Sequence, residues 1–282
     1  MTCGVGACDG GGTAAEPQIL AVKDQSHWTL PLDPYLAPHW AFELYAVDLL
    51  AEECMTARGL SENPMIPYDP NAPDPATHNG AGRRLFDPEI AAVYGYRWDP
   101  PLKYDRLRAL ELNATMGQEI AEAQTACEQQ VYKGLDIERQ DDWVLGTTAS
   151  FAPKADQVVV EAARKWHDCM GDLGVTDLPA TPSEFPTTEL WARWGLDDQS
   201  GDGGDDPMYD SPVPEEIDYA VKDAGCQESS GWAQAYYEVE WRLQAEYVEK
   251  NFGKLEKQRA ENESRVKLFK SIIDGSYQET GR

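Results

Sequence analysis

The sequence predicts a mainly α-helical protein, with two disulfide-stapled helical pseudo-repeats, Pro-rich connections and a long C-terminal helix. Three observations predict this fold class. The pattern Cys-Met-x-x-x-Gly-apolar ends two helical segments, at residues 54–60 and 169–175. A single cysteine recurs in a later helical segment of each half, and residues 232 to about 273 contain no proline. Because 41% of the 282 residues are hydrophobic and 10% aromatic, the chain can bury a core.

Residues 1–27 are predicted to form a flexible lipoprotein tether. Residues 5–8 read Val-Gly-Ala-Cys, the order of a bacterial lipoprotein cleavage box, and three glycines at 10–12 follow as a spacer. Cys8 is therefore the candidate lipidation site; the competing interpretation is a Gly-rich chain end in which Cys8 has no role. The first residues lack the basic start and apolar stretch of a complete signal peptide, so we expect the natural precursor to begin further upstream.

Residues 28–150 form the first predicted pseudo-repeat. Its first helix has an apolar face with alternating spacings of four and three, at Trp40, Leu44, Val47, Ala51 and Cys54. Gly59 is expected to end this segment in the left-handed conformation, where a side chain would clash. Leu60 should then fold back onto Met55, five residues earlier.

Residues 151–282 form the second predicted pseudo-repeat, and the two are expected to pack into one compact unit. The corresponding helical face carries Val159, Ala162, Trp166, Cys169 and Leu173. Gly174 is the expected terminator, and Val175 should contact Met170. A catalytic Cys169 is the competing interpretation, but His167 would point about 200° away from it on a helix.

The four cysteines outside the tether are predicted to pair within each half. Four cysteines allow three pairings, and the repeat makes Cys54–Cys127 and Cys169–Cys226 the simplest. Such bridges indicate an oxidising, extracytoplasmic setting. A four-thiolate zinc site lacks its usual Cys-x-x-Cys spacing. The halves also share Pro-rich stretches and aromatic-Gly-aromatic neighbourhoods, at residues 63–75 and 94–98 in the first half, and 178–186 and 191–196 in the second.

The last predicted helix, residues 232–273, contains one weak point, Gly253. Its early part should pack on the core, and its later part either projects or covers the first half. The apolar stripe has coiled-coil spacing but is polar in the middle, at Arg259 and Asn262, which argues against a coiled coil. A solvated helix with alternating charges and a partner-binding helix are both compatible with this pattern.

The chain is strongly acidic, with 24 Lys and Arg against 50 Asp and Glu and a net charge of −26. Such a chain repels phosphate backbones, so nucleic acid is not an expected partner. The excess is uneven, because residues 242–282 hold nine basic and seven acidic side chains. No run of 18 apolar residues occurs, so no spanning helix is predicted.

One acidic loop resembles the first half of a calcium-binding loop. Asp198, Ser200, Asp202 and Asp206 fall at loop positions 1, 3, 5 and 9, with a glycine at position 6. Tyr209 stands where the bidentate Glu is expected, so the ligand set is incomplete; the competing interpretation is an acidic loop without a site. No other cofactor is expected, and no catalytic residue is assigned because none of the common catalytic or phosphate-binding motifs occurs.

An ordered set of short motifs resembles the secreted lipoproteins of unknown function that are widespread in actinobacteria. The set covers about residues 28–260: Leu-Pro-Leu-Asp-Pro-Tyr at 30–35, the two Cys-Met helix ends, Ala-Val-Lys-Asp-Ala-Gly-Cys-Gln at 220–227, and a long helix with Glu240, Gln244 and Asn251. The resemblance implies an acidic cell-envelope protein, lipid-anchored at the outer face of the cytoplasmic membrane and often associated with transport systems. It implies no catalytic residues.

Two functions are compatible with these observations. The first is an extracytoplasmic, lipid-anchored binding or scaffolding protein, in its concrete form an accessory ligand-binding subunit of an envelope ABC transporter. The second is a cell-wall-active enzyme such as a glycan hydrolase, which requires a cleft with two carboxylates at glycosidase separation. The sequence names neither the small-molecule or peptide ligand nor the envelope protein partner.

Overall fold

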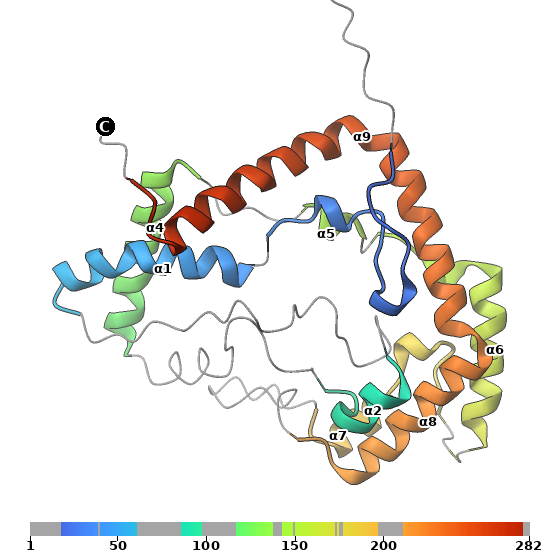
Figure 1. Ribbon diagram of the computed structural model, residues 1–282. Helices are drawn as coiled ribbons and strands as arrows, with labels where there is room; N and C mark the ends of the chain where they lie inside the picture. The colour runs from blue at the N-terminus through green and yellow to red at the C-terminus, as the bar shows by residue number, and fades with distance from the viewer. Residues whose placement is uncertain are drawn as a thin grey trace, which may run out of the picture.

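The computed structural model describes residues 18–38, 40–60, 86–97, 117–137, 143–148, 150–172, 174, 177–196 and 211–278. No β-strand occurs among these residues, which confirms the mainly α-helical fold class (Figure 1). The α-helices are α1 (Trp40–Ala57), α2 (Pro88–Tyr94), α4 (Gln118–Leu135), α5 (Trp143–Thr148), α6 (Gln157–Gly171), α7 (Thr188–Arg193), α8 (Pro214–Ser230) and α9 (Trp232–Ile273). Short 3-10 turns are η1 (Gln25–His27), η2 (Asp33–Tyr35), η3 (Pro153–Ala155) and η4 (Pro182–Glu184).

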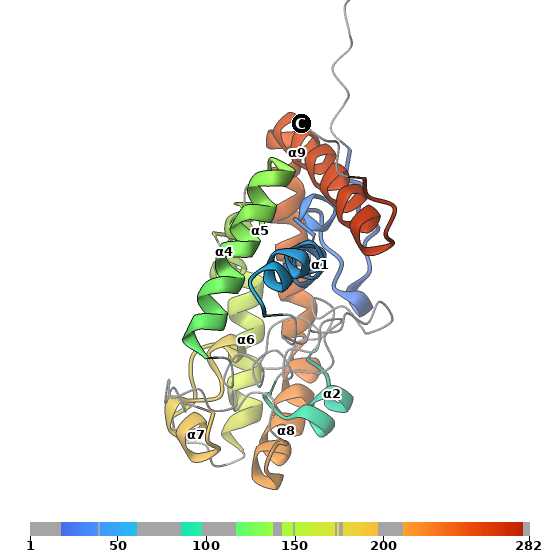
Figure 2. The same cartoon turned by 90° about the vertical axis from the view of Figure 1, so that its left-hand side faces the viewer.

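Helix α9 spans 42 residues, and its bounds agree with the predicted helix. Figures 1 and 2 show that it is bent near its middle. We call residues 232–252 its first arm and residues 254–273 its second arm. Two local features lie near the midpoint. Gly253 lacks a Cβ, and the Asn251 side chain donates to the Tyr247 carbonyl at 2.9 Å. Glycine and side-chain insertion into the helical hydrogen-bond ladder are known causes of helix bending.

The first arm of α9 packs on α6. Val159 and Ala162 of α6 are buried against Trp232 and Val239 of α9, which confirms that the early part of the helix packs on the core. Gly231, at φ +73°, turns the chain from α8 into α9. Helices α6, α8 and α9 thus pack together.

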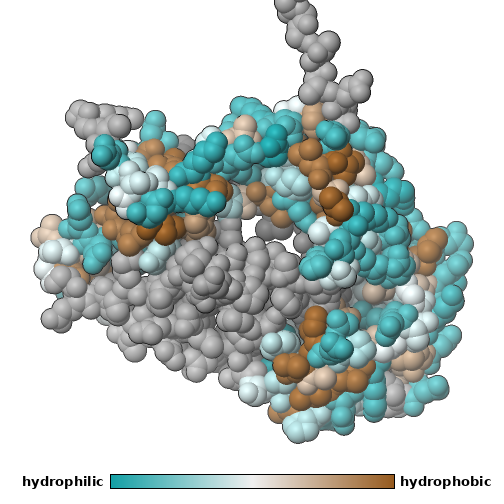
Figure 3. Space-filling view, viewed as in Figure 1, coloured by the Kyte–Doolittle hydropathy of each residue, from teal (hydrophilic) through white to brown (hydrophobic). Residues whose placement is uncertain are grey.

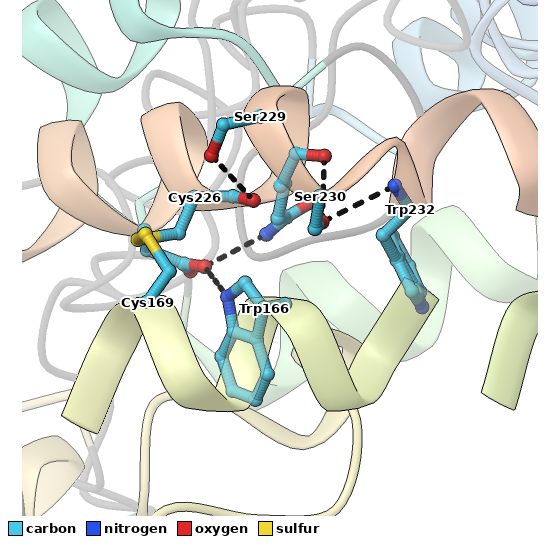
Figure 4. The surroundings of a disulfide bond; sticks show 8 residues. Trp166, Cys169, Cys226, Ser229, Ser230 and Trp232 are labelled. Carbon is cyan, nitrogen blue, oxygen red and sulfur yellow. Dashed lines mark hydrogen bonds between the residues drawn. A yellow bond between two sulfur atoms is a disulfide. The ribbon is translucent and has the colours of Figure 1, made fainter. Parts of the chain in front are cut away.

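The second disulfide joins this layer covalently. Cys169 of α6 and Cys226 of α8 are bridged, with their Cα atoms 5.7 Å apart, as predicted. Figure 4 shows the bridge beside the end of α8, where the hydroxyls of Ser229 and Ser230 donate to the carbonyls of Cys226 and Gln227. The Gly231 amide also donates to the Gln227 and Glu228 carbonyls, so side-chain and backbone donors together cap the end of α8.

The second arm of α9 covers α1, which resolves the two predicted options in favour of packing on the first half. Phe269 and Ile272 are buried with Ala46 of α1. Arg265 of α9 and Glu43 of α1 form a largely buried ion pair at 2.8 Å. On its other side α1 packs on α4, and the predicted bridge Cys54–Cys127 joins the two helices.

The end of α1 confirms the predicted cap. Gly59 has φ +80°, and the Leu60 amide donates to the Met55 carbonyl at 3.0 Å. Leu60 also packs against the cluster that contains Met55. The second motif differs: α6 ends at Gly171, and Gly174 at φ +76° follows in a turn. Val175 lies outside the described residues, so its contact with Met170 stays a prediction.

An extended N-terminal segment, residues 18–36, lies on the inner side of the α9 bend (Figure 1); we call it the strap. Its backbone and side chains bond to polar groups of the first arm. Trp28 donates its indole N–H to Glu240 at 3.0 Å, and the Leu32 amide donates to Gln244 at 3.1 Å. Leu32 is buried in a cluster with Val248 of α9.

Asn262 of the second arm holds the other end of the strap. Its Nδ2 donates to the carbonyls of Tyr35 at 3.0 Å and Leu36 at 2.8 Å. Its Oδ1 accepts from Gln258 at 2.9 Å, which orients the amide toward the strap. The polar interruption at Asn262 in the predicted apolar stripe is therefore a binding position for the strap backbone.

Helix α2 comes from the first half of the sequence but packs on α8 of the second. Tyr96, just after α2, is fully buried and stacks on Trp194, with ring centroids 5.6 Å apart and planes at 8°. The two aromatic-Gly-aromatic neighbourhoods therefore share one core. The predicted division at residue 150 stays a prediction, although α2 of the first half packs on α8 of the second.

We expect Asn262→Leu to lower the free energy of unfolding by about 1–3 kcal/mol, because it leaves two strap carbonyls without their donors. Urea unfolding followed by far-ultraviolet circular dichroism measures the change. Ser264→Leu introduces the same side chain at an exposed position of the same helix and should change stability by less than about 0.5 kcal/mol. Equal losses in the two variants would contradict the assigned role of Asn262.

Candidate functional site

A groove of about 920 Å³ runs between α6 and the first arm of α9. Its floor includes the small and aliphatic side chains of Ala162, Ala235 and Val239. Val158, at 60% exposure, forms part of one wall. The volume lies at the upper end of the range of about 300–1,000 Å³ that is usual for ligand sites. The groove can therefore accept an apolar or mixed surface.

Charged residues on the rim hold the walls of the groove together. Arg242 of α9 donates to Asp156, the N-cap of α6, at 2.9 Å, and also pairs with Glu246. Lys23 of the strap pairs with Glu238 and lies 5.5 Å from the centre of the Trp241 ring. These contacts tie the strap and α6 to α9.

The same pairing places cations beside carboxylates on the rim of the groove. Three of the carboxylates that line it, Asp156, Glu238 and Glu246, form ion pairs with Lys23 or Arg242. The arrangement favours recognition of a surface that carries both charges.

A second cluster of interest is a pair of buried acids on α8. Asp223 and Glu216 are both completely buried and lie seven residues apart, on one face of the helix. Asp223 accepts hydrogen bonds from Trp166 Nε1 at 2.7 Å, Gln227 Nε2 at 3.0 Å and the Tyr96 hydroxyl at 3.1 Å. Burial raises the pKa of Asp223 to about 7, although these three donors oppose the shift.

Glu216 holds the segment that follows α2. Its Oε1 accepts from the Tyr96 amide at 3.0 Å, and its Oε2 accepts from Arg97 Nε at 3.0 Å. Arg97 also donates to the Trp194 carbonyl at 3.0 Å. Burial is the main cause of the raised pKa of Tyr96, and the negative charge of Asp223 adds to it. Because these acids are closed off from solvent, they cannot act on a dissolved substrate in this conformation.

Sequence reasoning did not single out either acid. The available signal was the register of α8, because Glu216, Ala220, Asp223, Ala224 and Gln227 share a helical face with spacings of four, three, one and three. Acidic residues at the core positions of an amphipathic helix indicate buried, hydrogen-bonded carboxylates. Their partners, Tyr96, Arg97 and Trp166, come from other elements and give no local signal.

The predicted site residues have different outcomes. The four paired cysteines are brought together as expected, so Cys169 is not available as a catalytic thiol. Cys8 lies outside the described residues, and so do the candidate calcium ligands Asp198, Ser200, Asp202 and Asp206. Within the described ranges, no group of three or more His, Cys, Asp or Glu side chains is arranged to hold a metal ion.

Comparisons of the chain with protein-family models, with curated proteins and with solved structures find no match. The helices in the described ranges include none with the length and apolar character needed to cross a membrane. The two disulfides indicate an oxidising, extracytoplasmic environment.

We expect Gly95→Ala to destabilise the protein by about 2–4 kcal/mol, because it combines backbone strain with a core clash. Gly95 has φ +58° and ψ −125°, and a Cβ there would lie 2.5 Å from Glu216 Oε1 and 3.0 Å from Pro212 Cβ. The matched control is Gly59→Ala, at φ +80° with nothing within 4 Å, which should cost about 1–2 kcal/mol from conformation alone. Thermal unfolding of both variants measures the difference, and an equal loss would show that the approach of Glu216 is unimportant.

Proposed function

We propose that the protein is an extracytoplasmic, lipid-anchored binding protein that receives a segment of an envelope partner in the α6–α9 groove. In its concrete form it is an accessory subunit of an envelope ABC transporter. The observation that carries the proposal is the groove itself, an aliphatic floor between two helices with paired charges of both signs on its rim. The anchor on Cys8 rests on the cleavage-box pattern of residues 5–8, and the transporter association rests on the sequence resemblance.

Preorganisation of the groove supports a binding role. Its α6 wall is bonded to α8 through Cys169–Cys226, and α8 continues through Gly231 directly into the α9 wall. Arg242 fixes the N-terminal end of α6 to α9 at 2.9 Å. A site whose walls are already held in place loses little conformational entropy on binding, which favours affinity.

The small side chains of the floor favour a helical or extended peptide segment as the ligand. Ala162, Ala235 and Ala245 let a backbone approach α6 and α9 closely. The rim offers both cations and carboxylates, so a partner segment with apolar residues on one face and mixed charges at its edges is complementary. An anionic polymer is disfavoured by the overall charge of −26.

A photoreactive benzoylphenylalanine at position 158 should crosslink to an envelope protein in intact cells, because Val158 faces the groove. The same residue at position 260, an exposed alanine of α9 outside the groove lining, is the matched control and should give at least about tenfold less product. Mass spectrometry identifies the crosslinked protein.

Adding Ala235→Trp, which fills the floor of the groove, should abolish the crosslink from position 158. Ala260→Trp should leave it intact. Equal products from positions 158 and 260, or a crosslink that survives Ala235→Trp, would contradict partner binding in this groove.

Anchoring is a separate prediction. Expressed with a secretion signal in an actinobacterial host, the protein should sediment with membranes, and Cys8→Ala should move most of it to the soluble fraction. Cys3→Ala is the matched control and should leave it with the membranes. Recovery of both variants in the same fraction would contradict lipidation of Cys8 without bearing on the groove.

A further inference from the structure

We propose that residues 86–97, comprising α2 and the turn after it, form a pH-responsive latch on α8. The latch is closed most tightly when Asp223 carries a proton, and it loosens as Asp223 becomes ionised. This inference is independent of the proposed partner groove, because no latch residue lines that groove.

Polar atoms of the turn hold the latch closed. The Tyr96 amide and Arg97 Nε bond to the two oxygens of Glu216, and the Tyr96 hydroxyl bonds to Asp223 at 3.1 Å. Arg97 makes a further bond to the Trp194 carbonyl. Opening the latch would therefore uncover Glu216 and the side of Asp223 that Tyr96 covers.

The surroundings of Asp223 make its charge costly in the closed state. The side chains bonded to it are Tyr96 from the latch, Trp166 from α6 and Gln227 from α8, and none of these is a cation. The nearby charged pair, Glu216 with Arg97, is bonded within itself, and Tyr219 of α8 adds a further titratable hydroxyl beside Tyr96. An ionised carboxylate in such a site is less stable than one that reaches water.

A protonated Asp223 fits the same geometry. Its hydroxyl can donate to the Tyr96 oxygen, while its carbonyl oxygen continues to accept from Trp166 and Gln227. The closed state thus binds a proton that the open state releases. Because burial raises the pKa of Asp223 to about 7 from 3.8, closure is strongest below about pH 4 and weakens as the pH rises through 7.

Hydrogen exchange measured by mass spectrometry tests the latch directly. After correction for the intrinsic exchange rate at each pH, protection of the amides of residues 86–97 should fall on the order of 50-fold between pH 5 and pH 8. The Tyr96 amide reports most directly, since it donates to Glu216. Peptides from α1 and α4 should keep their protection over the same range.

Asp223→Asn mimics the protonated acid, so the protection of residues 86–97 should no longer depend on pH. Asp218→Asn, at an exposed position on the same helix, should behave as the wild type, and so should His167→Gln, which alters the histidine beside Trp166. Tyr96→Phe removes a donor that lowers the pKa of Asp223, so the loss of protection should move to higher pH.

Three results would overturn the latch. Protection of residues 86–97 that is constant with pH in the wild type would exclude it. So would an unchanged pH dependence in Asp223→Asn. A pH-dependent loss that spreads equally over α1, α4 and residues 86–97 would show that Asp223 controls global stability rather than a local opening.

Discussion

The structure depends on α9 meeting a different partner along each part of its length. A helix of 42 residues cannot bury one face against a single short element, because at about 1.5 Å per residue it is about 60 Å long. Its first arm packs on α6, the strap fills the inner side of the bend, and the second arm packs on α1. Among the described helices, α9 packs on members of both disulfide-linked pairs, on α1 in one and on α6 and α8 in the other.

Buried polar side chains of α8 and α9 form hydrogen bonds at the junctions between these elements. Gln244 and Asn262 form hydrogen bonds with the strap backbone, and Glu216 and Asp223 accept hydrogen bonds from the turn after α2. Each bond avoids the free-energy penalty of a buried group without a partner, and it specifies which segment can occupy the position. In a chain with a net charge of −26, Glu216 and Asp223 are nevertheless completely buried, and two of the residues that bond to them, Tyr96 and Trp166, are packed against other aromatic rings.

Features that depend on neighbouring residues could be predicted from the sequence. The bounds of α9, the cap at Gly59 and the two cysteine pairs follow from proline exclusion, glycine conformation and internal repetition. The packing of α2 on α8, the stack of Tyr96 on Trp194 and the strap on Asn262 could not be predicted, because each joins residues about a hundred or more positions apart. The polar residue Asn262 in the apolar stripe of α9 was visible in the sequence, but the strap carbonyls to which it donates were not. The groove also escaped prediction, because its walls come from α6, α9 and the strap.

The positions of the charged residues on α9 follow from which sides of the helix are packed against other elements. Inner positions of the helix are taken up by the strap and the packed helices, so charged residues remain on its outer side, which Figure 3 shows as a largely hydrophilic edge. There they alternate in sign and form pairs such as Lys250 with Glu246 and Lys257 with Glu261. Exposed pairs of this kind add little stability, but they keep the longest helix nearly neutral while the rest of the chain carries the acidic excess. An anionic surface that approaches the outer side of α9 therefore meets less repulsion than one that approaches the more acidic remainder of the chain.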